Sequence, residues 1–259
     1  MALLDQHDIY SLPVYSHDGP DKIVNIVNTF DLLDYLQSNG NRNLSAPIEA
    51  VMTLDTDRES YRIFEADRHD TLKPTLEAFS TNVHYALVID YHANPKPTAV
   101  LTQTDIVRYV ARHPESLHGL DLDASIEQIG LLDNKSPLVT VTEAQTALEA
   151  FAIMNDTNLT SVPVIDRDGK ICTNLRAFDS SLVAASKLDV LAKPVTEFLA
   201  ELTSTTLKPV TCRPSTSLRE VIDGVVASRT HHVWVVDDQD QAQQVVSLTD
   251  LIRIFRQAH

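Results

Sequence analysis

The chain has 259 residues, and 36 acidic against 21 basic side chains give it a formal net charge of -15. This charge excludes a general binder of phosphate backbones, and a content of 43% hydrophobic and 22% charged residues excludes a disordered or fibrous protein. No uninterrupted apolar run exceeds five residues, as in 85–89 and 150–154, so the sequence predicts neither a membrane span nor a signal peptide and favours a soluble intracellular protein.

The first half of the chain contains two copies of one pattern of strands and helices. The first copy has a short apolar strand at 11–14 and a last helix from Asp31; its opening strand is missing, because Met1 already falls in its first helix. Each complete copy is predicted as strand, helix, strand, strand, helix. The second copy has strands at 61–64, 85–89 and 99–102, a helix with Leu72, Leu76 and Phe79 on its buried side, and a last helix from Asp105.

The second half repeats the pattern twice. Thr142 and Gln145 in the third copy, and Ser217 and Glu220 in the fourth, stand at capping-box spacing before a helix with an apolar stripe. The third copy has strands at 139–141, 161–166 and 170–173, stripe residues Ala144, Ala147, Leu148 and Phe151, and a last helix from Asp179. The fourth has strands at 210–211 and 232–237, stripe residues Leu218, Val221, Ile222 and Val225, and a last helix from Asp250.

The aspartates that open the last helix of each copy lie 74, 74 and 71 residues apart. One copy has a small sheet that cannot bury both faces alone, so copies should pair. A polar connector at 113–123 divides the chain into two such pairs. The sequence thus predicts an α/β (α+β) fold of four repeats, each a three-stranded sheet with two helices. The first module covers 1–114, with repeats 1–45 and 46–114, and the second covers 120–259, with repeats 120–192 and 193–259.

The four aspartates allow two interpretations. A carboxylate in the first turn of a helix stabilises the positive end of the helix dipole. A carboxylate can also accept two hydrogen bonds side by side from the vicinal hydroxyls of a ribose, while the free amides of the helix start receive phosphate oxygens. Hydroxyl side chains close to the aspartates, such as Thr29, Ser247 and Thr249, fit the second interpretation.

Other residue types point away from catalysis and from metal binding. The six glycines lie too far apart for a phosphate-binding loop, and Cys172 and Cys212 lack the number and spacing of a disulfide framework or a zinc site. His231 and His232 are neighbours that face opposite sides of a strand, and no third ligand follows at a fitting distance. Without a nucleophile motif such as G-x-S-x-G, the chain is predicted to be no enzyme and to hold no metal.

The strand with Pro-Val, the hairpin and the Ser/Thr-x-x-Asp helix start resemble cystathionine-beta-synthase-type (CBS) repeats over nearly the whole chain. Such repeats pair as Bateman modules and bind adenosine nucleotides in the cleft between repeats. From about residue 120, the stretches 125–130, 177–179, 188–190, 231–237 and 246–250 are similar to the gamma regulatory subunits of AMP-activated protein kinase.

The resemblance implies three nucleotide sites. Asp179 and Asp31 would each hold the ribose of one nucleotide, with Thr29 close to Asp31. Asp105 would face a pocket that lacks a wall. The best-preserved site would have Asp250 on ribose, Ser247 and Thr249 beside it, and Asn134, Thr160 and His231 near adenine and phosphate.

The chain departs from the family at the positions that hold phosphates. Where the family has arginine or lysine, this chain mostly has uncharged residues, which leaves His84, His231 and His232 as the basic groups. Histidine is mostly neutral at pH 7, so we expect AMP to be favoured over ATP and only one or two sites to fill. Arg176 replaces a small hydroxyl residue of the family; it either reaches a phosphate or plugs the pocket of Asp179.

By resemblance, the chain is a non-catalytic regulatory subunit that binds AMP, ADP or ATP and assembles with kinase catalytic and scaffold subunits in a hetero-oligomer. The expected location is the cytoplasm, with the nucleus as a second location, and the expected partners include neither nucleic acid nor membrane. Two alternatives remain. One is a degenerate CBS scaffold that mediates protein contacts without a ligand, and the other is a Bateman regulator of another enzyme that binds a different adenosyl ligand, such as S-adenosylmethionine.

Overall fold

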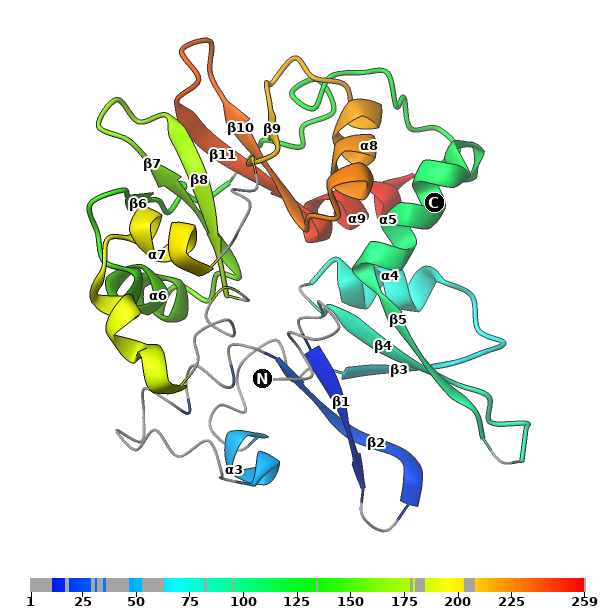
Figure 1. Cartoon of the computed structure of the whole chain (residues 1–259). Coiled ribbons are helices and arrows are strands. Elements are labelled where there is room, and N and C mark those ends of the chain that lie inside the picture. The colour runs from blue at the N-terminus through cyan, green and yellow to red at the C-terminus, as the bar shows by residue number, and fades with distance from the viewer. Residues whose placement is uncertain are drawn as a thin grey trace. The chain divides into compact units, whose positions relative to one another are not determined.

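The computed structural model describes residues 11–16, 19–28, 31, 35, 47–52, 63–81, 83–94, 96–133, 135–177, 179, 185–202 and 208–258. The chain forms two compact units, called unit 1 (Met1–Tyr61 with Val139–Lys208) and unit 2 (Arg62–Leu138 with Pro209–His259). Each unit therefore draws on both halves of the chain, and the helices and strands of both are labelled in Figure 1.

The described part of unit 2 contains two three-stranded sheets of the same topology. In each sheet the middle strand pairs in parallel with the first strand and antiparallel with the last. This is the order predicted for the second and fourth repeats. One sheet consists of β3 (Ile63–Asp67), β4 (Tyr85–Ile89) and β5 (Thr98–Thr102), and the other of β9 (Thr211–Cys212), β10 (His232–Val236) and β11 (Ala242–Ser247).

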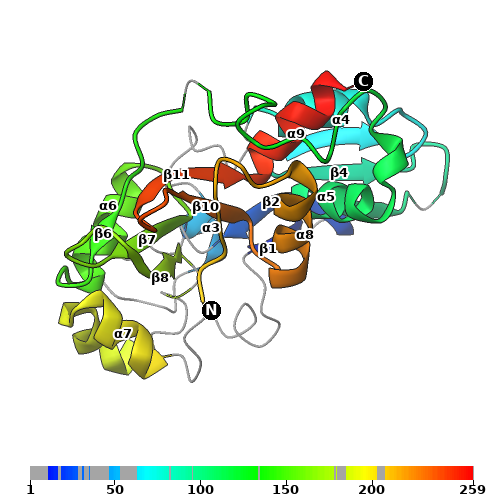
Figure 2. The same ribbon diagram turned by 90° about the horizontal axis from the view of Figure 1, so that it is seen from above.

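Helices from the second and fourth repeats share the core of unit 2. They are α4 (Lys73–Phe79), α5 (Gln103–Arg112), α8 (Leu218–Ser228) and α9 (Leu248–Gln257). In both views α5 lies beside α8 and α9 (Figures 1 and 2). None of the helices in the described residues has the length and apolar character needed to cross a membrane.

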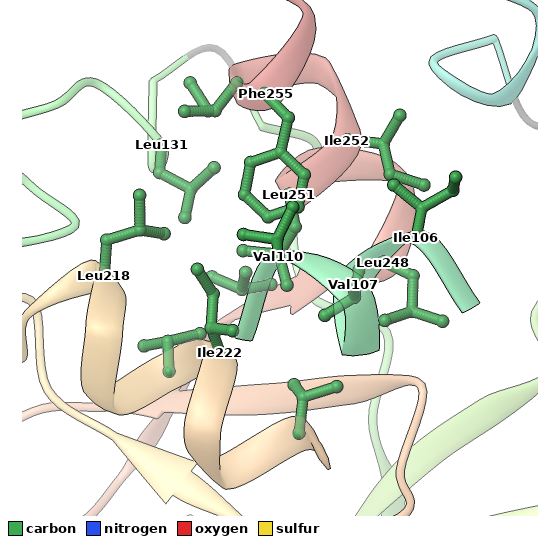
Figure 3. Close-up of a cluster of buried hydrophobic side chains, with 14 of the residues drawn as sticks. Ile106, Val107, Val110, Leu131, Leu218, Ile222, Leu248, Leu251, Ile252 and Phe255 are labelled. Atoms are coloured by element: carbon green, nitrogen blue, oxygen red, sulfur yellow. The ribbon is translucent and has the colours of Figure 1, made fainter. Parts of the chain in front are cut away.

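The apolar side of α9 is at the centre of this core. Leu251 and Ile252 are fully buried, Phe255 is 1% exposed, and Figure 3 shows them together with Val107 and Val110 of α5. Burying a large aliphatic or aromatic side chain contributes about 1.5–3 kcal/mol relative to leaving it exposed. The pairing of the second and fourth repeats through their helices is therefore a main source of stability in unit 2.

Capping boxes define where the helices begin. The predicted box of Ser217 and Glu220 is confirmed at the start of α8. The predicted start of the third repeat's helix is wrong: Gln145 accepts a hydrogen bond from the Thr142 amide, but α6 (Ala147–Asp156) begins later, with Thr146 and Glu149 as its box. Two capping signals overlap here, and Thr146, which has the extended backbone of a helix cap, also forms a β-bridge with Pro194.

Later helix starts change which side chains are buried. Leu72 is 49% exposed because it is the cap residue before α4, and Leu148 is 51% exposed on α6. Ala144, predicted for the same stripe, is exposed as well, since it precedes the helix. The remaining stripe predictions are confirmed, with Leu76, Phe79, Ala147, Phe151, Leu218, Val221, Ile222 and Val225 all buried.

Unit 1 contains a two-stranded antiparallel sheet and, in the third repeat, a three-stranded sheet with the topology seen in unit 2. Helices α6 and α7 (Val195–Leu202) pack together, with the rings of Phe151 and Phe198 edge to face at 5.6 Å between centroids. The strands of unit 1 are β1 (Ser11–Ser16), β2 (Gly19–Asn28), β6 (Val141–Thr142), β7 (Ser161–Ile165) and β8 (Ile171–Arg176). The other described elements of unit 1 are α3 (Ile48–Met52) and the 3-10 segment η4 (Ala185–Ala192).

The opening segments of the third and fourth repeats do not pack on the repeats that they open. The Ile126 amide donates to the Thr216 carbonyl at 2.9 Å and Leu218 to Ala124 at 3.1 Å, so the start of the third repeat packs on α8 of the fourth. The Val195 amide donates to the Gln145 carbonyl at 2.8 Å, so α7 at the start of the fourth repeat packs on the third. The boundary predicted at 192/193 follows the sequence period and stays a prediction. The modules predicted at 1–114 and 120–259 stay a prediction.

Candidate ligand-binding carboxylates

Asp250 lies at the start of α9, where it completes a capping box with Ser247. Its Oδ2 accepts from the Ser247 amide at 2.9 Å and from the Ser247 hydroxyl at 2.7 Å, and the Asp250 amide donates to that hydroxyl at 3.2 Å. The serine has an extended backbone that favours this exchange. The helix-stabilising interpretation of Asp250 is therefore correct as far as it goes, and it leaves room for a second role.

Two cations of the same chain contact the Asp250 carboxylate. The Lys135 ammonium donates to Oδ2 at 2.6 Å and also to the Val245 carbonyl at 2.7 Å, while Arg253 donates to Oδ1 at 3.1 Å. The side chains of Lys135 and Asp250 are only 13% and 14% exposed, whereas Arg253 is 53% exposed. The pair of Lys135 and Asp250 is thus the sheltered one, and Arg253 adds a contact from the solvent side.

The protonation of Asp250 follows from these neighbours. Burial acts most strongly on the carboxyl group and by itself raises its pKa. The positive charge of Lys135 and the hydrogen bonds from Lys135 and Ser247 together outweigh burial, so the pKa of Asp250 lies below its usual value. Asp250 is therefore a carboxylate at neutral pH, which is the form that accepts hydrogen bonds from a sugar.

Asp179 is more deeply buried, with 1% of its side chain exposed. Its Oδ2 accepts from the Arg176 amide at 2.7 Å, and its Oδ1 accepts from the Arg176 Nε at 3.2 Å and Nη2 at 2.7 Å. Burial raises the pKa of Asp179, and the contacts with Arg176 oppose that rise. Sequence analysis left two roles open for Arg176, contact with a phosphate or filling of the pocket of Asp179. In the structure its guanidinium donates to the Asp179 carboxylate.

The remaining two aspartates differ in exposure. Asp105 caps α5 through Thr102, whose hydroxyl donates at 2.7 Å, and it pairs with Arg108 at 3.3 Å with 42% of its side chain exposed. Asp31 is 1% exposed. Thr29, predicted beside Asp31, lies outside the described residues.

Thr249 and Ser247 lie on different sides of the helix start. Ser247 caps α9 beside the Asp250 carboxylate, as predicted. Thr249 is 7% exposed, and its hydroxyl accepts a hydrogen bond from the Gln103 side chain at 2.9 Å in the core of unit 2. Gln103 also donates to the Phe79 carbonyl at 3.0 Å, so Thr249 takes part in a buried polar link between the second and fourth repeats.

The other predicted contact residues are spread over both units. In unit 2, the ring of His232 contacts that of Trp234 at 4.5 Å between centroids with a tilt of 53°, and His231 is exposed. His84 contacts the ring of Tyr85 at 6.3 Å. Thr160 belongs to unit 1 and is exposed. Asn134 lies outside the described residues, so its place beside Asp250 stays a prediction.

Sequence reasoning missed Lys135 and Gln103. Lys135 stands in the irregular segment before β6, where a single lysine gives no signal, and its partner Asp250 is 115 residues further along the chain. Gln103 is 6% exposed, and only its position directly after the cap residue Thr102 could have suggested a role. Within the described residues, no group of three or more His, Cys, Asp and Glu side chains is arranged to hold a metal ion.

Comparisons with known proteins identify the class. The family model of the CBS domain matches residues 127–172 and 199–257, and the topology of the second repeat equals that of the third and fourth. Protein MJ1225 of Methanocaldococcus jannaschii, described as a proposed archaeal homologue of g-AMPK, superimposes with a TM-score of 0.71 over 98% of this chain and 91% of its own, at 15% identity. This likeness shows the fold. Residues 127–172 and 199–257 are therefore CBS domains.

Within this class the chain resembles the gamma regulatory subunits of AMP-activated protein kinase. The gamma-like regulatory subunit PV42a of the SNF1-related protein kinase from Arabidopsis thaliana is 23% identical over 269 residues, which cover 90% of this chain and 75% of PV42a. The gamma subunit of the 5'-AMP-activated protein kinase from Saccharomyces cerevisiae is 26% identical over 255 residues, which cover 97% of this chain and 74% of the yeast protein.

Proposed function

We propose that the chain is a non-catalytic regulatory subunit that binds an adenine nucleotide through Asp250. The observation that carries the proposal is the Asp250 carboxylate itself. It is ionised, its side chain is only 14% exposed, and it lies at the start of a helix, where free amide groups favour the binding of a phosphate. The names of the plant and yeast relatives, both gamma or gamma-like subunits of kinases, support a regulatory role.

Isothermal titration with AMP, ADP and ATP tests this function. We expect binding of AMP, and we expect Asp250→Asn to weaken it at least tenfold, because hydrogen bonds to a charged group contribute about 1.5–3 kcal/mol. The matched control is Glu220→Gln, which changes the same position of the capping box at α8. Glu220 caps its helix through Ser217 in the same way and is no predicted ligand residue.

A second candidate function is a scaffold that has kept the fold and lost its ligands. The contacts of Arg176 with Asp179 and of Lys135 with Asp250 favour it, because both carboxylates already have a cation of their own chain. A scaffold shows no change in melting temperature with added nucleotide. A protein that binds the nucleotide gains about 2.7 kcal/mol at one hundred times the dissociation constant, so thermal melts in millimolar AMP separate the two functions.

The kinase partnership is tested separately from the ligand. We expect the tagged chain, purified from cells of its own source, to recover a kinase catalytic subunit and a scaffold subunit. Recovery of an unrelated enzyme without a kinase would support the third function, a regulator with a different adenosyl ligand. The cytoplasmic and nuclear location stays part of this proposal and is read from the same tagged protein by microscopy.

A further inference from the structure

We propose that Lys135 is an internal occupant of the Asp250 carboxylate and determines which ligands this site accepts, because a ribose can bind there only when it displaces the lysine ammonium. This inference rests on the proposed function and adds a residue to it. The ammonium lies 2.6 Å from Oδ2, which is the distance of a strong charge-assisted hydrogen bond.

The carboxylate has no room for a diol while Lys135 is in place. On Oδ2 the Ser247 amide, the Ser247 hydroxyl and the Lys135 ammonium already donate, and on Oδ1 Arg253 donates. Two neighbouring hydroxyls would donate one hydrogen bond to each oxygen, so the hydroxyl that reaches Oδ2 can bind only in place of a donor already there. One of the three donors on Oδ2 must therefore leave.

Lys135 is the donor that a ligand can replace. The two contacts from Ser247 belong to the helix cap, so their loss would also open the first turn of α9. Arg253 contacts the other oxygen, lies 53% exposed one turn along the same helix, and can turn into water at little cost. Lys135 comes from outside the helix, and its second partner, the Val245 carbonyl, holds it in place when no ligand is present.

Displacement has a cost that selects among ligands. The Lys135 side chain is 13% exposed, so an ammonium that loses its carboxylate there stays partly desolvated without an anion. Adenosine is neutral and supplies no new anion to the lysine. The intact chain is therefore expected to bind adenosine weakly, and removal of the ammonium is expected to strengthen adenosine binding.

The test is titration of adenosine into the whole chain and into Lys135→Met. We expect the variant to bind adenosine at least tenfold more tightly, and we expect Lys135→Met combined with Asp250→Asn to lose this gain. Lys73→Met is the matched control, because it removes the same charge from an exposed position of unit 2, and its affinity should equal that of the unaltered chain. Thermal melts establish that each variant is folded, and Lys135→Gln replaces Lys135→Met if the latter does not fold.

Each outcome decides the matter. Equal or weaker adenosine binding by Lys135→Met overturns the role of Lys135. If the unaltered chain binds AMP in a parallel titration, the proposed function stands without a role for Lys135. Absence of binding of both adenosine and AMP to every folded variant overturns the inference and the proposed function together.

Discussion

At the scale of single residues, Asp250 and Asp179 are each paired with a cation of the same chain. The two pairs differ in origin, since Lys135 lies 115 residues before Asp250 in the chain and Arg176 ends the strand just before Asp179. The consequences for protonation also differ. Burial dominates at Asp179 and raises its pKa, whereas the charge of Lys135 and the hydrogen bonds outweigh burial at Asp250 and lower its pKa.

The lowered pKa of Asp250 predicts a pH dependence of stability. Because the folded-state pKa lies below the unfolded value of about 4, the stabilisation is present above that value and is lost as the pH falls through the folded-state pKa. The charged groups that face this carboxylate are Lys135, from the segment before β6, and Arg253 on its own helix. The raised pKa of Asp179 has the opposite effect on the pH dependence of stability. This effect is the same in the unaltered chain and in an Asp250 variant, so it cancels when the two are compared.

We expect Asp250→Asn to reduce the free energy of unfolding at pH 7 by about 1–3 kcal/mol, because the lysine ammonium then lacks its anion. The difference from the unaltered chain should shrink between pH 5 and pH 2. Urea unfolding at several pH values measures it. Asp238→Asn, at a side chain that is 94% exposed, serves as the charge-matched control. A difference that stays constant down to pH 2 would contradict the assigned cause of the shift.

At the scale of elements, the helices of the second and fourth repeats are held together by apolar packing. Ile252 on α9 is fully buried in this core, and Figure 3 shows it beside Ile106 of α5. We expect Ile252→Ala to lower the free energy of unfolding by about 2–5 kcal/mol, since it removes buried methyl groups and leaves a cavity. Leu148→Ala, at a side chain that is 51% exposed on α6, should change it by less than about 0.5 kcal/mol.

Urea midpoints of the two variants give a direct comparison. An effect of Leu148→Ala as large as that of Ile252→Ala would show that Leu148 contributes more to the fold than its 51% exposure indicates. It would also return Leu148 to the buried stripe in which the sequence placed it.

The order of elements could be predicted because it depends on local signals. Strand and helix periods and the capping box of Ser217 and Glu220 are fixed by neighbouring residues, and they gave the topology of the second, third and fourth repeats. Leu148 was misplaced because the buried side of α6 carries Ala147, Ala150, Phe151 and Met154, and Leu148 lies off that side. The contact of Lys135 with Asp250 depends on tertiary packing and leaves no periodic signal.

At the scale of the whole molecule, each compact unit takes segments from both halves of the chain. The sequence period predicts that residues 120–259 form a module of their own. In unit 2, however, α8 and α9 of that half bury their apolar sides against α4 and α5 of the other half. The sequence period predicts that an isolated second half folds by itself, whereas this packing predicts that it exposes an apolar surface.

We expect a fragment of residues 120–259 to associate with itself, because the side of α9 that carries Leu251, Ile252 and Phe255 loses its cover from α4 and α5. Size-exclusion chromatography with light scattering measures the mass, and urea unfolding measures the stability. Addition of residues 1–119 in trans should restore a complex of one copy of each fragment. A fragment that stays monomeric and unfolds at the midpoint of the whole chain would instead show that the second half is an independent module, and that the packing of α9 on α5 adds little to its stability.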